Sequence, residues 1–398
     1  MSVDPYRRVL ALPGVRALML VGLVARVPVT ATGLTLTMYV VKELGLGFFQ
    51  AGLVGAGATL GIAVGAPVAG RLIDRYGLRP VVGVTTVFQL AFWLTASFLP
   101  YAALLAGALL SGILAIPIMG LMRQCVSVMV PPEHRRPAYS LDSVLGEISY
   151  MIGPAFAVAA SAAVGSHWTM AAVGVGLVGA GAALYLLNPP TREASDDPAA
   201  SAAPPPRRRE WLSPALLALL AVSAAGTFVV TATELSIVAI LEDDHATTWS
   251  GLVIGLWCAW SLIGGLVYGG LKKGMSPLTV AALMALTTAP VGFVTDWRLL
   301  AFALIPAGLL CAPSMASAVD ALSRLVPDTS RGEAMGLHST SLTLGLALGG
   351  PLTGWVIDEA GAAWGFLLAG GVGLLLVLVA VPLWRAAPRR GALTAKTA

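Results

Sequence analysis

Charged residues are scarce in this sequence. Of its 398 residues, 11% are charged whereas 57% are hydrophobic, and the mean hydropathy is +0.84. So small a charged fraction cannot cover the water-facing surface of a soluble protein of this length. The composition therefore excludes an ordinary soluble globular protein and predicts an integral membrane protein.

Cysteines and catalytic motifs are also few. Cys125, Cys258 and Cys311 lie far apart inside apolar segments, which indicates neither a disulfide framework nor a metal site. The sequence contains no P-loop, no zinc-binding helix motif and no serine nucleophile elbow. We therefore expect no enzymatic activity, no cofactor and no metal.

Long apolar runs separated by short polar segments make up most of the chain. A membrane helix needs about 20 predominantly apolar residues. Twelve such segments are predicted, at residues 15–41, 50–70, 79–99, 101–123, 138–163, 168–188, 212–240, 249–270, 276–295, 298–323, 333–356 and 362–384. The first apolar run is too long for a cleaved signal peptide, so the first helix should remain in the mature protein.

Positive charges are distributed unequally between the two sides of these segments. With the N-terminus assigned to the cytoplasm, 21 of the 24 Lys and Arg residues fall on the cytoplasmic side. Lys42 and Arg298 fall on the other side, and Arg26 lies within a helix. This asymmetry predicts a multi-pass protein of the cell membrane with both termini in the cytoplasm. It also explains the isoelectric point of about 9.1, so no nucleic-acid partner is expected.

The run Gly70-Arg71-Leu72-Ile73-Asp74-Arg75-Tyr76-Gly77-Leu78-Arg79 is the most specific motif in the chain. Its charges cannot lie in hydrocarbon, so it is predicted to form a short aqueous loop between two membrane helices. The run resembles, with the same spacing, the G-x-L-x-D-R-x-G-R-R/K signature between helices two and three of the major facilitator superfamily.

The resemblance implies a role for each part of this motif. Asp74, Arg75 and Arg79 would form a cytoplasmic latch between the two halves of the transporter, released as the halves rock. Gly70 would allow close helix approach and Gly77 a tight turn. The alternative is a positively charged cytoplasmic loop with no switching role.

The chain also carries weak internal repeats. A proline- and alanine-rich segment, residues 189–211, is predicted to be a flexible cytoplasmic linker between six-helix bundles at 1–188 and 212–385, with a cytoplasmic tail at 386–398. Gly65 and Gly264 correspond at an offset of 199 residues. The dipeptide Gly153-Pro154 recurs as Gly350-Pro351 at an offset of 197 residues. Two parallel repeats around a central cavity are the architecture that the resemblance implies.

The fifth predicted helix resembles, in part, a motif of the antiporter branch of this superfamily. Gly146 and Gly153-Pro154 match G-x-x-x-G-P-x-x-G-G imperfectly, because Ser149 and the residues after Pro154 depart from it. The eleventh helix matches about as well around Gly350-Pro351. Proline and small residues there permit a bend and tight packing, so the motif favours efflux only modestly over ordinary helix packing.

One position departs from the drug-antiporter pattern. Helix four of those transporters usually carries an arginine four residues before a glycine, but here Ala108 precedes Gly112 at that spacing. Arg26 in the first helix would then take over the cationic role, or the protein is not proton-coupled in the usual way.

Ionisable residues inside predicted helices are candidates for the transport chemistry. A charge at the bilayer centre costs at least about 2.5–3.5 kcal/mol on insertion scales and needs a partner or water. The candidates share helical stripes with other polar residues, which predicts a common wet cavity. They are Arg26 with Thr30, Glu147 with Tyr150, Glu234 with Thr231, and His338, whose alternative is a structural hydrogen-bonded histidine.

Depth along the helices suggests how these charges pair. Arg26 and Glu147 both lie about ten residues from their cytoplasmic ends, so we expect them to pair, either as part of the mechanism or as a structural ion pair. We hypothesise that Glu147, with Glu234 as second candidate, alternates between a proton and either substrate or Arg26. Asp142 is expected to pair with an arginine of the loop motif and Asp320 with Lys272 or Lys273, as gating or structural pairs.

These observations predict a monomeric secondary active transporter working by alternating access. A proton-coupled exporter of small amphipathic compounds or metabolites is the leading hypothesis, with protons, a small-molecule substrate and the lipid bilayer as its partners. A proton-coupled importer of a small nutrient is the nearest alternative, and a transport-inactive membrane receptor is the alternative from another class.

Overall fold

The fold is entirely helical in the described part of the chain. The computed structural model describes residues 4–191, 212–270, 274–294, 296–326 and 331–386, and no strand occurs in these ranges. Eleven of their helices are long and apolar enough to cross a membrane, and the shorter apolar segment Pro277–Phe293 lies where the ninth span is predicted. The prediction of an all-α membrane protein is therefore confirmed.

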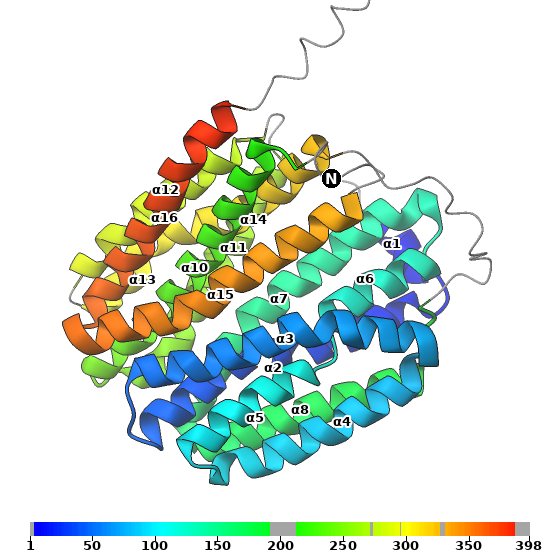
Figure 1. Ribbon diagram of the computed structural model, residues 1–398, viewed down its shortest axis with the longest axis horizontal. Helices are drawn as coiled ribbons and strands as arrows, with labels where there is room; N and C mark the ends of the chain where they lie inside the picture. The colour runs from blue at the N-terminus through cyan, green and yellow to red at the C-terminus, as the bar shows by residue number, and fades with distance from the viewer. Residues whose placement is uncertain (1–3, 192–211, 271–273, 295, 327–330, 387–398) are drawn as a thin grey trace, which may run out of the picture. The chain divides into compact units, whose positions relative to one another are not determined.

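The first half of the chain forms eight α-helices (Figure 1). They are α1 (Asp4–Ala11), α2 (Val15–Lys42), α3 (Phe48–Tyr76), α4 (Leu78–Thr95) followed by the 3₁₀ turn η1 (Ala96–Phe98), α5 (Tyr101–Ile113), α6 (Ile118–Met129), α7 (Pro132–Val164) and α8 (Ser166–Leu187). Within this half α2 packs against α7 and α8, and α3 packs against α5.

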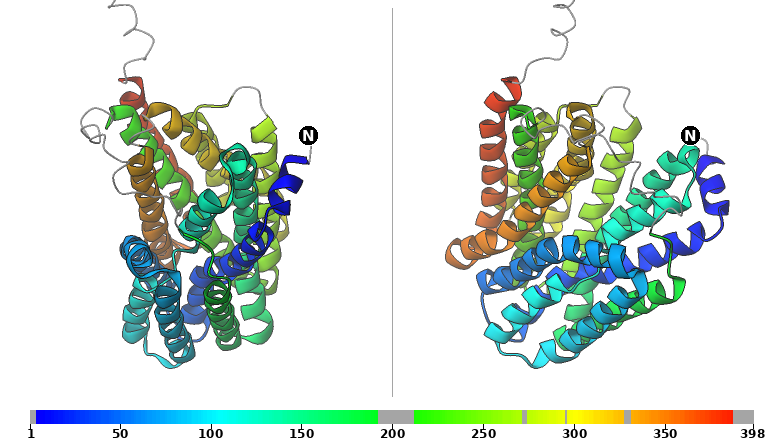
Figure 2. Two further views of the ribbon diagram at one scale, coloured as in Figure 1. Left: turned by 90° about the vertical axis from the view of Figure 1, so that its right-hand side faces the viewer. Right: turned by 45° about the vertical axis from the view of Figure 1, so that its right-hand side comes forward.

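The second half continues with helices of similar length (Figures 1 and 2). They are α10 (Pro214–Asp243), the 3₁₀ turn η3 (Thr247–Trp249), α11 (Ser250–Gly270), α12 (Pro277–Thr288) with η4 (Ala289–Phe293), α13 (Trp297–Ala303), α14 (Ile305–Leu325), α15 (Arg331–Ala360) and α16 (Ala362–Arg385). Within this half α12 packs against both α14 and α16.

Prolines interrupt three of the predicted spans. The span at 101–123 is divided between α5 and α6 before Pro117, the span at 276–295 tightens to a 3₁₀ turn around Pro290, and the span at 298–323 is divided at Leu304, two residues before Pro306. Proline lacks the N–H that the helix needs and restricts the residue before it. In contrast α7 continues through Pro154, and α15 continues through Pro351.

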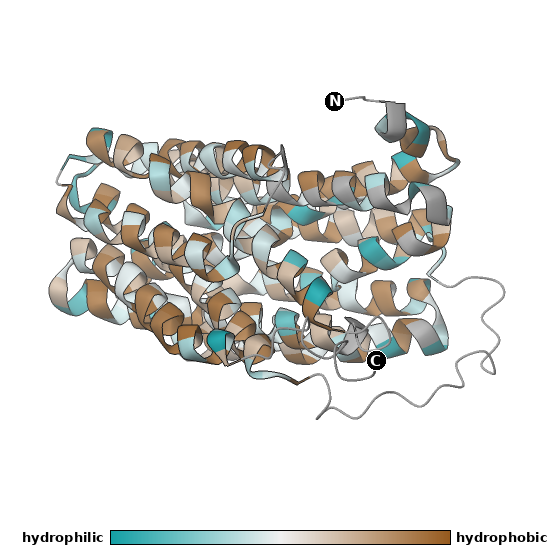
Figure 3. Cartoon of the chain, turned by 90° about the horizontal axis from the view of Figure 1, so that it is seen from above, coloured by the Kyte–Doolittle hydropathy of each residue, from teal (hydrophilic) through white to brown (hydrophobic). Residues whose placement is uncertain are grey.

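The chain divides into two compact units. The first contains residues 1–202 and 241–255, and the second contains residues 203–240 and 256–398. Each unit has its own buried apolar core, built in the first around Leu18, Met122 and Leu184 and in the second around Leu216 and Phe228. Hydrophobic residues predominate along the helices (Figure 3), and many large ones, such as Leu266 and Phe302, are exposed, as lipid contact requires. The predicted linker lies largely outside the described residues.

Close contacts at glycines reveal the internal repeat in three dimensions. Gly65 of α3 lies against the carbonyl of Ile113 in α5, and Gly264 of α11 lies against the carbonyl of Leu309 in α14. The correspondence predicted between these two glycines is confirmed by equivalent contacts within the two units. Small residues are used in this way wherever membrane helices approach closely.

A second pair of contacts corrects the predicted register of the repeat. Gly153 of α7 lies against Thr30 of α2, and Gly345 of α15 lies against Thr227 of α10. The structural counterpart of Gly153 is therefore Gly345 and not Gly350. The repeated feature is a glycine that faces a threonine, and the Gly-Pro dipeptide is not part of it.

Candidate functional site

A buried ion pair joins α2 to α7 in the first unit. Arg26 is 2% exposed, and its Nη2 lies 2.5 Å from Oδ1 of Asp142. Its Nη1 also donates a hydrogen bond of 3.1 Å to the backbone carbonyl of Asp142. On the other side of the carboxylate, Nε of Arg123 in α6 lies 3.8 Å from Oδ2. Asp142 therefore lies between two guanidinium groups.

This arrangement bears on two predicted pairings and corrects the second. Arg26 binds Asp142, and its pairing with Glu147 stays a prediction, because the Glu147 side chain lies outside the described residues. Asp142 in turn binds Arg26 and Arg123 where the sequence predicts an arginine of the loop motif. The reason is the start of α7, which begins at Pro132, six residues before the predicted span, so that Asp142 lies as far along α7 as Arg26 lies along α2.

Next to this ion pair, a hydrogen bond from Thr30 links α2 to α7. Its hydroxyl donates to the carbonyl of Ser149 at 2.8 Å and to the carbonyl of Val27 at 3.0 Å. A Cβ on Gly153 would lie only 2.7 Å from the carbonyl oxygen of Val27, so the absence of a side chain allows this approach. Tyr150 is half exposed on the same helix. Thr30 and Gly153 thus contribute to helix packing.

The charged motif forms a helix end with a single turn residue. Helix α3 continues to Tyr76 and α4 begins at Leu78, so the predicted loop is reduced to Gly77, with φ of 86° and ψ of 168°. Only glycine adopts such a conformation readily. The tight turn expected at Gly77 is present, whereas a Cβ at Gly70 would meet no described atom within 4 Å, so the predicted close approach is not seen there.

The arginines of the motif make local contacts. Arg79 Nε donates to the carbonyl of Tyr185 in α8 at 3.1 Å, and its guanidinium lies 5.7 Å from the centre of the Tyr185 ring. Arg75 lies over the ring of Tyr76 at 5.1 Å. The side chain of Asp74 lies outside the described residues. The latch between the halves stays a prediction.

In the second unit, a polar stripe on α10 ends at a carboxylate. Thr227 donates to the carbonyl of Leu342 in α15 at 2.9 Å, and Thr231 packs against Gly349 of the same helix. The Thr231 hydroxyl is buried without a hydrogen-bond partner. Glu234, one turn further, is partly buried, and no hydrogen bond or ion pair reaches its carboxylate from the described residues.

The remaining predicted residues of the second unit lie apart from Glu234. His338 on α15 is 4% exposed, and Ser341 donates to its backbone carbonyl at 2.7 Å. Asp320 forms an exposed ion pair with Arg324 on α14. The predicted partners of Asp320, Lys272 and Lys273, are outside the described residues.

A buried polar network between α4 and α5 is absent from the sequence predictions. Gln89 is 7% exposed; its amide donates to the carbonyl of Ser111 at 2.8 Å, and its Oε1 accepts from Trp93 Nε1 at 3.2 Å and from Ser111 Oγ at 3.0 Å. The signal that could have found it is a lone glutamine in an apolar run with a tryptophan four residues later. Both the amide nitrogen and the amide oxygen of Gln89 are hydrogen-bonded, and these bonds hold α4 and α5 together.

Gly112, at the position where the helix-four motif of drug antiporters ends, packs closely against α3. A Cβ there would collide with the Ala58 carbonyl and lie 2.9 Å from Gly61 of α3.

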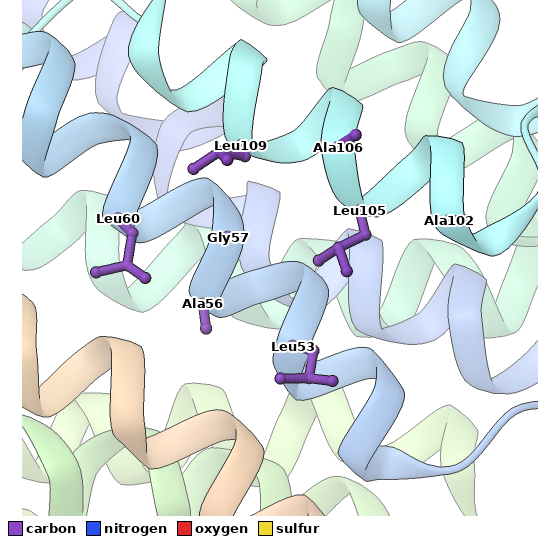
Figure 4. A pocket seen from close by; sticks show the side chains of 8 residues that line it. All are labelled: Leu53, Ala56, Gly57, Leu60, Ala102, Leu105, Ala106 and Leu109. Carbon is purple, nitrogen blue, oxygen red and sulfur yellow. The ribbon is translucent and has the colours of Figure 1, made fainter.

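Near Gly112, an apolar groove with a volume of about 430 Å³ runs between α3 and α5 (Figure 4). It is lined by Leu53, Ala56, Gly57, Leu60, Ala102, Leu105, Ala106 and Leu109. This lining suits hydrocarbon and offers no group for proton transfer.

Comparisons with known proteins agree with this architecture. The sequence profile of the Major Facilitator Superfamily matches residues 18–280 and 270–398. The uncharacterized MFS-type transporter y4rN of Sinorhizobium fredii (strain NBRC 101917 / NGR234) is 24% identical over 386 residues, which cover 92% of this chain and 93% of that protein.

Solved structures share the fold at low sequence identity. The nucleoside transporter NupG has a TM-score of 0.66 at 14% identity, covering 93% of this chain and 99% of that one. A bacterial homolog of the human lysosomal transporter Spinster has a TM-score of 0.71 at 13% identity, with coverages of 96% and 97%. The D-xylose-proton symporter has a TM-score of 0.69 at 14% identity, with coverages of 94% and 98%. The family profile matches most of the chain, and the helices and the repeated glycine contacts agree with it. The chain therefore belongs to the major facilitator superfamily.

Proposed function

We propose that this protein is a secondary active transporter that exports small amphipathic compounds or metabolites in exchange for protons, by alternating access. The observation that carries the proposal is the carboxylate of Glu234, which lies partly buried in the second unit without a partner among the described residues. An ionised carboxylate in apolar surroundings is costly unless it is paired. Either a proton or a bound substrate can remove that cost. Because the two cannot bind Glu234 at the same time, the flux of protons is coupled to the flux of substrate.

The Arg26–Asp142 pair supports Glu234 over Glu147 as the main proton carrier. A mechanism in which Arg26 exchanges with Glu147 needs an arginine that is free to move. Arg26 is instead held by two bonds to Asp142 and sealed from solvent. We assign the ion pair to the structure of the first unit, and we keep Glu147 as the second candidate carboxylate.

The direction of transport is proposed from the partial antiporter motif around Gly153 and Pro154. The main alternative is proton-coupled import, which is favoured by the similarity in fold to the D-xylose-proton symporter. Export and import use the same fold and the same carboxylate. They differ in the sign of the proton flux that accompanies the substrate.

Proton flux in vesicles of known orientation tests the proposal. Purified protein is reconstituted with a pH-sensitive dye inside, a pH gradient is imposed, and a panel of neutral, cationic and anionic compounds is added. We expect at least one compound to cause proton movement opposite to its own, and Glu234→Gln to abolish it. Glu359→Gln, which alters an exposed carboxylate at the end of α15, is the matched control and should leave the flux unchanged. Proton movement in the same direction as substrate would establish import, and no flux with any compound would refute proton-coupled transport.

A further inference from the structure

We infer that the substrate recognised at Glu234 is an organic cation that also carries a hydrogen-bond acceptor, and that the indole N–H of Trp257 binds that acceptor. The inference rests on the proposed function and names its substrate class. Three features of the second unit support it: the charge balance around Glu234, the direction in which this residue faces, and an unpaired donor at the same depth.

The charge balance requires a cation from outside the protein. In the described helices of the second unit the basic side chains stand at helix ends: Arg298 at the start of α13, Arg324 near the end of α14 and Arg385 at the end of α16. Asp142 of the first unit, in contrast, has two guanidinium groups within 4 Å. Because Asp142 has cationic partners and Glu234 has none among the described residues, a proton or a cationic ligand is the source of compensating charge that remains.

The direction of Glu234 follows from its neighbours on α10. Thr231 faces Gly349 of α15, and Gly226 faces Met315 of α14. Glu234 is seven residues after Thr227, which bonds to α15, so at about 100° per residue it lies on nearly the same side of α10 as Thr227. Glu234 is nevertheless partly exposed, so α15 does not cover it completely. Glu234 is thus not fully buried, which the binding of a ligand beside it requires.

The described titratable groups of α14 and α15 do not supply a cation to Glu234; the nearest in level, Asp358 about five residues past it on α15, is itself an acid and is exposed. Gly345 lies level with Thr227 and Gly349 with Thr231, so Glu234 is level with about residue 353 of α15. His338 lies about 15 residues before that level, or roughly 20 Å along the helix. Asp320 is already paired with Arg324 on α14. Among the described residues of α14 and α15, no cationic partner therefore lies at the level of Glu234.

Trp257 of α11 supplies an unpaired donor. Its side chain is buried, with 4% exposure, yet its Nε1 has no hydrogen-bond partner among the described residues. The indole lies against α14 because position 308 is a glycine: a Cβ on Gly308 would lie 3.1 Å from Cδ1 of Trp257. A buried N–H without an acceptor destabilises the structure because its hydration is lost and not replaced. A ligand oxygen at this site would remove that cost.

Trp257 and Glu234 lie at the same depth on consecutive helices. Glu234 is nine residues before the end of α10 at Asp243, and Trp257 is seven residues after the start of α11 at Ser250. With a rise of about 1.5 Å per residue, their levels differ by about 3 Å. One turn from Trp257, the partly buried Trp260 adds an aromatic ring that favours cations. An anion, an N–H donor and an aromatic ring together select a protonated or quaternary amine that bears an ether, carbonyl or hydroxyl oxygen.

Binding of permanent cations to the purified full-length protein in nanodiscs tests the inference. The probes are tetraethylammonium, tetraphenylphosphonium, 1-methyl-4-phenylpyridinium and the 4-methoxyphenyl analogue of the last. Their charges do not change with pH, so any pH dependence of binding belongs to the protein. We expect binding that weakens as the pH falls, because protons compete for Glu234. Glu234→Gln should weaken it at least tenfold and remove the pH dependence, whereas Glu359→Gln should change neither.

The role of Trp257 needs a separate comparison. Trp257→Phe keeps an aromatic ring but removes the N–H, so it should weaken binding of the methoxy analogue several-fold while leaving the unsubstituted pyridinium unchanged. Trp355→Phe, at an exposed position on α15, is the matched control. Equal effects of Trp257→Phe on both pyridiniums would overturn the assignment of the donor. If Glu234→Gln does not fold, Glu234→Asp keeps the charge and should retain pH-dependent binding.

The outcomes separate this inference from the proposed function. If none of the four cations binds while a neutral or anionic compound drives proton flux that depends on Glu234, the cationic substrate class is wrong and proton-coupled transport stands. If cations bind at Glu234 but no compound moves protons, the substrate class stands and the coupling is wrong. Failure of both binding and flux overturns both.

Discussion

Replacing Asp142 with asparagine tests the central electrostatic feature of the first unit. The substitution keeps the size and shape of the side chain and the backbone carbonyl that accepts from Arg26, but it removes the negative charge. Arg26 is then a buried guanidinium without a counter-ion among the described residues, and both side chains of the pair are at most 4% exposed. Solvent therefore cannot compensate for the lost partner.

The expected loss of stability follows from this burial. Removing one member of a buried ion pair costs about 3–5 kcal/mol, because an uncompensated charge remains. Because Asp142→Asn keeps the backbone carbonyl and an amide oxygen as acceptors for Arg26, we expect its cost near the lower end of this range, at about 3 kcal/mol. Removing both charges with Arg26→Met and Asp142→Leu should recover most of the loss, since no buried charge is then left unpaired.

A second ion pair in the same protein provides the control. Asp320 and Arg324 are exposed, with side-chain exposures of 48% and 67%. Asp320→Asn makes the same chemical change there and should cost no more than about 0.5 kcal/mol. Equilibrium unfolding in mixed micelles with increasing dodecyl sulfate measures the free energies, with thiol labelling of the buried Cys125 as the readout. A difference below about 1 kcal/mol between the two substitutions would refute the reasoning.

Three further predictions concern the first unit, and the first two compare matched sites. Gly77→Ala should destabilise the protein by about 1–3 kcal/mol because its backbone conformation excludes other residues, whereas Gly70→Ala should be neutral or stabilising in the same unfolding assay. Gly153→Ala should cost about 1–3 kcal/mol because a Cβ would collide with α2, and Gly146→Ala, with open space around it, should not; equal effects would contradict the proposed helix contact. Gln89→Leu should cost about 1–3 kcal/mol by leaving buried polar groups of α4 and α5 unpaired, and an unchanged unfolding free energy would show that water replaces the amide.

The sequence by itself determined that the chain is a helical membrane protein of this superfamily. A run of about 20 apolar residues can satisfy its backbone polar groups in lipid only as a helix, so each span is decided locally. The motif at residues 70–79 and the repeated Gly65 and Gly264 were likewise readable, because they depend on short spacings. Arg26 and Glu234 could be singled out as charges within apolar helices for the same reason.

Only the tertiary structure decided which groups meet. Arg26 and Asp142 are 116 residues apart, and their contact depends on the relative registers of α2 and α7. A shift of one helical turn in the start of α7 changes the residue opposite Arg26, and apolar patterning does not define that start. The same holds for the match of Gly153 with Gly345, and for Glu234, which has no partner among the described residues. Hydrophobicity selects the helices, but the pairing of their polar atoms is a property of packed neighbours.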